Sequence, residues 1–298
     1  MVIPDFKYFR PKSLPEALTL LGQSDDVALI AGGTDLLVEI KKGLRRHDNM
    51  ISLSDIGELK VLEEDGKKVY IGSAVTHNEL VVSPVIRKNL MAISNTATKI
   101  GCEQIRNKGT VGGNICTAAS CCDLGPILMA LGTMVEIRSS KGNREVPLKD
   151  FFVFHRKTVL AKGEMVTRVI VPIPGPGSGA HFEKFGLREA AAVSVASVAA
   201  MIKLDHGTCA DACIVIGAVA PVPKISQGAV DIILGKDLSQ LSENSSVLEQ
   251  AGIAAAEDAI PIDDIRGGAK YRRDILKVLT RRAISKAVFF AQQTPGIS

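Results

Sequence analysis

The hydrophobic pattern of the first 55 residues alternates between strand-like and helix-like segments. Val27 to Ala31 is a compact apolar run and Asn49 to Leu53 is a second one, so both indicate buried strands. Between them, Asp35 to Lys42 has the spacing of a helix. This part of the chain is therefore expected to form a βαβ-like unit.

Residues 56 to 175 combine one long helical pattern with several short strands. A single apolar helix face is indicated by five residues at spacings of four and three: Ile86, Leu90, Ile93, Ala97 and Ile100. Strands are expected at Leu59 to Leu62, Lys68 to Ile71, Thr133 to Arg138 and Met165 to Ile173. The dipeptide Asp65-Gly66 predicts a hairpin between the first two of these strands.

The pattern changes after Pro172 to Gly179, a stretch rich in proline and glycine that is typical of a linker. Beyond it, Val193 to Leu204 and Cys209 to Val219 predict two long strands of an antiparallel hairpin. From Ser226 on the pattern is helical, most strongly from Arg272 to Gln292. We therefore predict an α+β fold in two domains, residues 1–175 (with subdomains of about 1–55 and 56–175) and residues 180–298.

Composition narrows the class of protein. With 298 residues and 46% hydrophobic content, the chain has enough apolar side chains to fill cores, which indicates a globular protein rather than a disordered one. Its net charge of +4 is spread along the chain and only 4% of the residues are aromatic, so we expect no nucleic-acid partner. No stretch approaches the ~18 apolar residues that span a bilayer. Met1 to Asp5 shows no signal-peptide pattern either, so we expect a cytoplasmic protein without a membrane span.

The first candidate binding segment is Ala31-Gly32-Gly33-Thr34-Asp35, which follows the first apolar strand. Glycine permits a positive φ and lets the backbone approach a ligand without a Cβ in the way. Consecutive N–H groups at such a turn form a concavity that suits a pyrophosphate. An ordinary tight turn explains the same two glycines, so both interpretations stay open at this point.

A second glycine pair lies in the segment Thr110-Val111-Gly112-Gly113-Asn114, which we also interpret as a turn. Asp123 follows nine residues later and suits ribose hydroxyls, but a cap for the helix expected near Pro126 is an equal alternative. Neither pair lies in a G-x-G-x-x-G or a G-x-x-x-x-G-K-[ST] motif. Their absence argues against a Rossmann NAD domain and against an NTPase.

Together these motifs resemble the FAD-binding medium subunit of the molybdenum hydroxylases, the family of xanthine, carbon monoxide and nicotinate dehydrogenases. The motifs are A-G-G-T-D-L at 31–36, I-R-N-K-G-T-V-G-G-N at 105–114 and the trailing Asp123. The similarity covers nearly the whole chain, from Pro11 to Leu21 at its start to Asp264 to Arg272 near its end. It implies a two-subdomain FAD-binding fold of the vanillyl-alcohol oxidase and p-cresol methylhydroxylase type. A C-terminal medium-subunit flavoprotein domain, an antiparallel three-stranded sheet with helices, would follow it.

The resemblance also implies that FAD is the cofactor. The first glycine segment would wrap its pyrophosphate, and the second would line the flavin and the phosphates. Asp123 would bind a sugar hydroxyl, Val166 would offer a backbone contact, and Lys184 would lie near the isoalloxazine or its phosphates. The complete predicted set is Ile30, Ala31, Gly32, Gly33, Thr34, Asp35, Leu36, Ile100, Thr110, Val111, Gly112, Gly113, Asn114, Asp123, Val166 and Lys184.

Other reactive side chains suggest no further site. Cys116, Cys121 and Cys122 follow the second glycine segment without the spacing of an iron–sulfur cluster, so we interpret them as small buried thiols near the cofactor. The five histidines are scattered and give no metal-ligand pair. Lys184 lies between Phe182 and Phe185 on an expected strand, so a solvent-facing lysine is the alternative to a cofactor contact.

By this resemblance the chain is an electron-transferring FAD oxidoreductase subunit with no catalytic side chain of its own. Its partners would be a molybdopterin-binding large subunit and a small subunit with two [2Fe–2S] clusters, and NAD or another compound would accept the electrons. Two alternatives stay open: a self-sufficient FAD oxidoreductase, and a structural adaptor that has lost FAD. The substitution Gly112→Val is predicted to abolish FAD retention in a folded chain, because a branched side chain would intrude where the phosphates approach.

Overall fold

The first sheet in the computed structural model is small and parallel. The structure describes residues 3–23 and 25–294, so the predicted domain ends at 1–2 and 295–298 lie outside the described residues. The sheet has the order β1-β3-β2, formed by β1 (Lys7–Phe9), β3 (Asn49–Ser52) and β2 (Val27–Ile30). Helices α1 (Leu14–Gln23) and α2 (Leu36–Lys41) connect these strands. The predicted βαβ-like unit is confirmed.

The second sheet, here called the middle sheet, has five antiparallel strands in the order β4-β5-β10-β6-β7. They are β4 (Leu62–Glu64), β5 (Lys68–Gly72), β10 (Met165–Pro172), β6 (Met134–Ser139) and β7 (Gly142–Pro147). The strand expected at Leu59 to Leu62 is wrong over its first part, because Gly57–Lys60 forms the short 3-10 helix η1. This turn buries Leu59 completely in the core beneath α1, where an extended strand would have left it at the sheet edge.

Short helices fill the space next to the middle sheet. They are α3 (His77–Val82), α4 (Pro84–Asn89), α5 (Met91–Thr98), α6 (Glu103–Arg106), α7 (Val111–Thr117), α8 (Leu124–Ala130) and α9 (Leu148–Phe151), with the small strands β8 (Phe152–Phe154) and β9 (Lys157–Thr158) after them. The five residues of the predicted apolar face are all buried. They do not share one helix: Ile86 belongs to α4, Ile93 and Ala97 belong to α5, and Leu90 and Ile100 lie outside both helices. The backbone of Leu90 (φ −140°, ψ 48°) leaves helical geometry between α4 and α5.

The third sheet, here called the C-terminal sheet, has the order β11-β12-β13-β14. Its three long antiparallel strands, β11 (Ser178–Gly186), β12 (Ser194–Asp205) and β13 (Thr208–Gly217), agree with the predicted sheet. The fourth strand, β14 (Lys224–Ile225), is only two residues long and too short to leave a sequence pattern. Helices α10 (Gln227–Ile233), α11 (Ser246–Asp258) and α12 (Ala269–Gln293) follow, with the 3-10 helix η2 (Leu238–Gln240) between α10 and α11.

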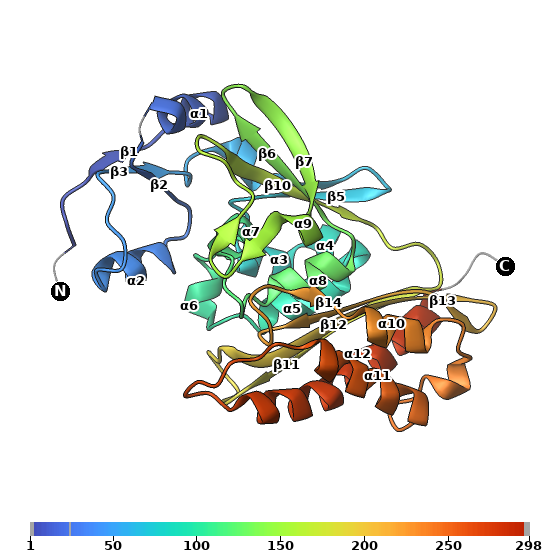
Figure 1. The fold of residues 1–298 in the computed structure, drawn as a ribbon. Helices are drawn as coiled ribbons and strands as arrows, with labels where there is room; N and C mark the ends of the chain where they lie inside the picture. Colours follow the sequence, from blue (N-terminus) through green and yellow to red (C-terminus); the bar gives the residue numbers. More distant parts are fainter. Residues whose placement is uncertain (1–2, 24, 295–298) are drawn as a thin grey trace.

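These elements stack in layers (Figure 1). Helices α5 and α8 lie between the middle sheet and the C-terminal sheet, and one hydrophobic core joins Val169 of β10, Ile93 of α5 and Val215 of β13. Helices α10 to α12 cover the other face of the C-terminal sheet and form a second core with it. Strands β12 and β13 are therefore buried on both faces, which explains their nearly continuous apolar sequences.

Candidate functional site

A groove of about 630 Å³ brings the two glycine segments together. Most of the predicted site residues line it: Ile30, Ala31, Gly32, Gly33, Thr34, Asp35, Leu36, Ile100, Thr110, Gly113, Asn114 and Asp123. Residues 161–164 and 191–193 form further parts of its walls. Segments from distant parts of the sequence therefore converge on one site.

The first glycine segment turns sharply between β2 and α2. Gly33 has a φ of 70°, which glycine adopts without strain. A Cβ on Gly32 would lie 1.8 Å from the carbonyl oxygen of Lys108, so only glycine fits where the two segments touch. Among the described residues, the backbone N–H groups of Gly32, Gly33 and Thr34 donate to no other atom of the chain. Three free donors at the groove wall are what an anionic ligand requires.

The second glycine segment is the beginning of α7, so the predicted turn is wrong. The Thr110 hydroxyl caps this helix by accepting a hydrogen bond from the Gly113 amide at 3.0 Å. The amides of Val111 and Gly112 donate to the carbonyls of Val75 and Ser73. These backbone donors are already occupied. The segment faces the groove through the Thr110, Gly113 and Asn114 positions instead.

Gly112 faces the protein interior. A Cβ at this position would lie 2.6 Å from the Ser73 Cβ and 2.8 Å from the Ser73 carbonyl oxygen. The glycine therefore permits close packing between α7 and the end of β5. The predicted reason for the Gly112→Val effect, intrusion on the phosphates, is wrong because Gly112 does not line the groove in the described structure.

Asp123 precedes α8 and binds the C-terminal sheet. Its Oδ2 accepts a hydrogen bond from Lys184 Nζ at 2.6 Å, and its Oδ1 accepts one from the Ser194 hydroxyl at 2.5 Å. It makes no side-chain cap to α8, so the capping alternative is wrong. Burial raises the pKa of Asp123, and the Lys184 ammonium opposes this effect. The carboxylate lies at the groove wall, so its predicted contact with a sugar hydroxyl stays a prediction.

Lys184 is buried, with only 7% of its side chain exposed, so the solvent-facing alternative is wrong. Its Nζ also donates to the carbonyl of Lys99 at 2.9 Å, while Lys99 Nζ donates to the carbonyl of Phe182 at 2.8 Å. Lys184 of β11 thus donates to the residue that follows α5, and Lys99 donates back to β11. Lys184 lies behind Asp123 rather than in the groove lining of the described residues.

Val166 is likewise absent from the groove lining among the described residues. It lies in the middle sheet opposite Ile137, with its side chain in the hydrophobic core. The neighbouring residue Glu164 lines the groove, and its carboxylate accepts hydrogen bonds from Arg144 at 2.7 and 2.8 Å.

Two polar atoms in the groove wall have no partner. His77 Nδ1 and Asn114 Oδ1 are buried and make no hydrogen bond within the described structure. Burial lowers the pKa of His77 to about 4, with the Arg106 charge adding to the shift, so the imidazole is neutral at pH 7. Sequence reasoning missed His77, and no motif marks it apart from the capping box of Thr76 just before it. Buried polar atoms without partners indicate that a ligand completes the site.

Cys116 near the end of α7 and Cys121 and Cys122 after it are free and line the groove; Cys122 is buried as predicted, whereas Cys116 and Cys121 are half-buried. Burial raises the pKa of the Cys116 and Cys122 thiols to about 12, so both are protonated and unreactive at neutral pH. Among residues 3–23 and 25–294, no group of three or more His, Cys, Asp or Glu side chains is arranged to hold a metal ion. Over the same residues, no helix is long and apolar enough to cross a membrane.

Charged side chains from two parts of the chain meet at another stretch of the wall. Glu39 of α2 is bonded to Arg156 and lies 2.8 Å from Arg45 Nε. Arg156 has a φ of 57°, and its amide donates to the carbonyl of Ala118 just after α7. This strained residue therefore connects α2 to the C-terminal end of α7.

Comparison with known proteins decides the family. Residues 4–174 match the family described as the FAD binding domain in molybdopterin dehydrogenase, and residues 180–287 match the CO dehydrogenase flavoprotein C-terminal domain. The chain belongs to the FAD-binding medium subunits of the molybdenum hydroxylases. Its cofactor is FAD.

Medium subunits of known enzymes are similar over almost their whole length. The carbon monoxide dehydrogenase medium chain of Afipia carboxidovorans is 31% identical over 288 residues, which cover 96% of this chain and 98% of that one. A carbon monoxide dehydrogenase structure from Hydrogenophaga pseudoflava superposes with a TM-score of 0.91 at 30% identity, covering 96% and 98% of the two chains. Quinoline 2-oxidoreductase from Pseudomonas putida 86 gives a TM-score of 0.90 at 29% identity, covering 99% of both. The predicted fold is confirmed.

The groove suits FAD. Its free amides at Gly32 to Thr34 match a pyrophosphate, and the unpartnered His77 and Asn114 atoms suit the polar groups of a sugar or a flavin. The contact between Gly32 and Lys108 keeps side chains out of the cradle. Backbone donors and buried polar side chains are therefore available in the groove for contacts with the cofactor.

Proposed function

We propose that this medium subunit transfers electrons between two partners. It would receive them from the [2Fe–2S] clusters of a small subunit, after a molybdopterin-binding large subunit has oxidised the substrate, and pass them to NAD or another acceptor. Bound FAD supplies the redox chemistry, while the chain binds, orients and shields the cofactor. We also propose the domain limits 1–175 and 180–298. The first domain would bind FAD, and the second would support the wall of the groove.

The observation that carries this proposal is the set of three free backbone donors at Gly32, Gly33 and Thr34, together with the occupied donors of α7. We assign the pyrophosphate to the first glycine segment. We assign Thr110, Gly113 and Asn114 to side-chain and surface contacts with the rest of the cofactor. Asp123 and Lys184 then fix the groove wall against the C-terminal sheet.

The buried histidine and thiols of the groove offer little acid–base chemistry, and the carboxylates of Glu39, Asp123 and Glu164 are held in ion pairs. His77 is neutral and buried, and the three thiols that line the groove are Cys116, Cys121 and Cys122, each with a pKa raised by burial. A relay subunit needs no proton donor for a substrate, whereas an enzyme with its own substrate requires one. The known relatives act on substrates as different as carbon monoxide and quinoline, according to their names. Substrate choice is therefore assigned to the large subunit.

An anaerobic experiment on the assembled complex tests the relay. The flavin absorbance is followed after substrate is added to the complex, and then after substrate is added to the large subunit and this chain without the small subunit. The proposal expects reduction of the flavin only when the small subunit is present. A third sample contains this chain alone, and reduction of its flavin by substrate would instead support a self-sufficient FAD oxidoreductase.

A further inference from the structure

An apolar core joins the N-terminal unit, residues 3–55, to the middle part of the chain. Leu21 and Ile51 of this unit belong to one buried cluster with Ala74 and Met165. The FAD groove lies along one side of the unit, and a second cleft, of about 660 Å³, lies beneath its helix α1. Hollows on two sides leave the unit room to tilt about this core, as a hinged lobe does.

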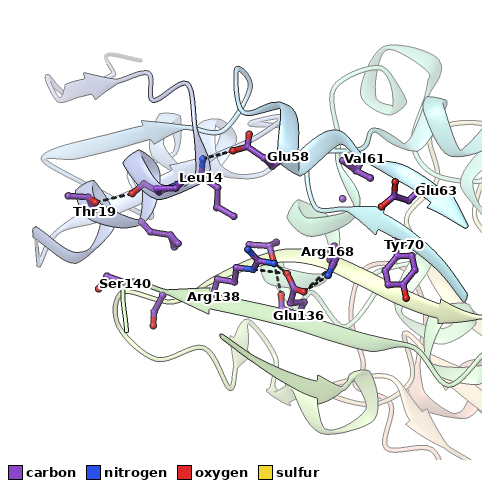
Figure 2. A pocket seen from close by; sticks show the side chains of 15 residues that line it. Leu14, Thr19, Glu58, Val61, Glu63, Tyr70, Glu136, Arg138, Ser140 and Arg168 are labelled. Carbon is purple, nitrogen blue, oxygen red and sulfur yellow. Dashed lines mark hydrogen bonds and ion pairs between the residues drawn. The ribbon is translucent and has the colours of Figure 1, made fainter. Parts of the chain in front are cut away.

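Figure 2 shows the second cleft between α1 and the middle sheet. Leu14 lies on the α1 side, and Glu136 lies on the sheet, where its carboxylate is bonded to Arg138 and Arg168 of the same sheet. Among the described residues, no hydrogen bond or ion pair joins α1 to β5, β6 or β10. The contacts that keep the N-terminal unit against the FAD groove must therefore come from the groove side.

Two ion pairs on the groove side join the N-terminal unit to the segment between α9 and β10. Glu39 of α2 is paired with Arg156, in the turn between β8 and β9. Asp25, between α1 and β2, is paired with Lys162, between β9 and β10. Asp25, Glu39 and Lys162 all line the groove. Both pairs therefore tie one wall of the groove to the other.

The Glu39 pair is the stronger of the two. The Glu39 side chain is only 11% exposed and that of Arg156 37%, whereas both partners of the other pair are mostly exposed. Exposed ion pairs stabilise little, while a buried carboxylate depends on its partners. Arg156 also has a φ of 57°, which arginine rarely adopts, and its amide is held by the Ala118 carbonyl. Such a conformation indicates a functional constraint on this residue.

We propose that the two ion pairs form a clasp that must open for FAD to enter or leave the groove. Glu39 Oε1 is bonded to Arg156, while its Oε2 lies 2.8 Å from Arg45 Nε, within the N-terminal unit. When the clasp opens, Glu39 keeps Arg45 as its partner and Arg156 turns to water. Opening therefore strands no buried charge. The clasp concerns how FAD is retained, so it does not depend on the proposed electron route.

Flavin fluorescence in a stopped-flow instrument tests the clasp on the full chain. Mixing FAD with the flavin-free chain gives the association rate constant, and diluting the loaded chain gives the dissociation rate constant. Glu39→Gln and Arg156→Gln are each expected to raise both constants by about three- to tenfold, because the closed clasp slows passage in both directions. The double variant is expected to match the single ones. Lys162→Gln, which removes the exposed pair, is expected to raise both constants by about twofold.

Two control variants complete the test. Arg156→Lys keeps the charge and is expected to retain slow exchange, and Arg282→Gln removes an exposed pair with Glu243 on α12 and is expected to change nothing. Faster dissociation with unchanged or slower association in Arg156→Gln would overturn the clasp, because Arg156 would then contact FAD itself. Unchanged rate constants in both Glu39→Gln and Arg156→Gln, with a lowered Tm, would also overturn it, since the pair would then only support the fold. The two substitutions act on opposite walls, so a folding defect in one leaves the other as the test.

Discussion

Lys184 Nζ lies 2.6 Å from the carboxylate of Asp123, although 61 positions separate the two residues in the sequence. Both side chains are more than 90% buried. The ion pair joins β11 of the C-terminal sheet to the residue that precedes α8, at the wall of the FAD groove. The C-terminal part of the chain therefore helps to fix the cofactor site.

Removing the charge from one member of this pair is expected to destabilise the protein. Asp123→Asn leaves the Lys184 ammonium buried without a counter-charge, which typically costs about 3–5 kcal/mol. Denaturant unfolding measures the change in the free energy of unfolding. Asp274→Asn is the control, because its exposed pair with Lys277 is worth about 1 kcal/mol or less. Equal effects of the two substitutions would contradict this role of the pair.

Gly32→Ala is expected to weaken FAD binding, because its Cβ would displace the Lys108 carbonyl and open the contact between the glycine segments. Overpacking of this kind costs about 1–3 kcal/mol. FAD affinity is measured by titrating the flavin-free chain. Gly57→Ala is the matched control, since a Cβ there meets no atom within 4 Å, and it is expected to bind FAD like the unmodified chain.

Gly112→Val is expected to destabilise the fold itself. The new side chain would clash with the backbone of Ser73 at the end of β5, with or without cofactor. Thermal unfolding of the flavin-free chain should therefore show a clear drop in Tm. An unchanged Tm together with lost FAD binding would show that Gly112 faces the cofactor after all.

His77 makes stability depend on pH. Its pKa is about 4 in the folded protein and 6.5 when solvated, so the unfolded state binds a proton first as the pH falls. The stability that neutral His77 provides is complete above pH 6.5 and is lost towards pH 4. Linkage gives a loss of about 2 kcal/mol between pH 6.5 and 4.5. Denaturant unfolding across this range should show a smaller loss in His77→Gln, which does not titrate.

The sequence predicts the elements well where local patterns decide them. The parallel N-terminal strands and the long strands β12 and β13 follow from apolar runs. The burial of the five apolar positions in and next to α4 and α5 follows from their helical spacing. The break between the two helices at Leu90 does not follow from the sequence, because the apolar spacing continues across it without interruption.

Tertiary contacts explain what the sequence could not predict at the site. Helix α7 begins after Thr110, whose hydroxyl caps it by accepting a hydrogen bond from the Gly113 amide. The glycine pair obscured this helix start in the sequence. The occupied donors of α7 depend on the carbonyls of Ser73 and Val75, which no local pattern connects to it. Lys184 of β11 likewise pairs with Asp123 at the start of α8, a contact between distant parts of the chain that no local pattern predicts.

Amide hydrogen exchange with and without FAD tests the central claim most directly. The amides of Gly32, Gly33 and Thr34 are free, whereas those of Val111, Gly112 and Gly113 already have partners in the protein. We therefore expect FAD to slow exchange strongly at residues 32–34 and to change it little at residues 111–113. Protection confined to residues 111–113, or no protection at residues 32–34, would contradict this account of the FAD site.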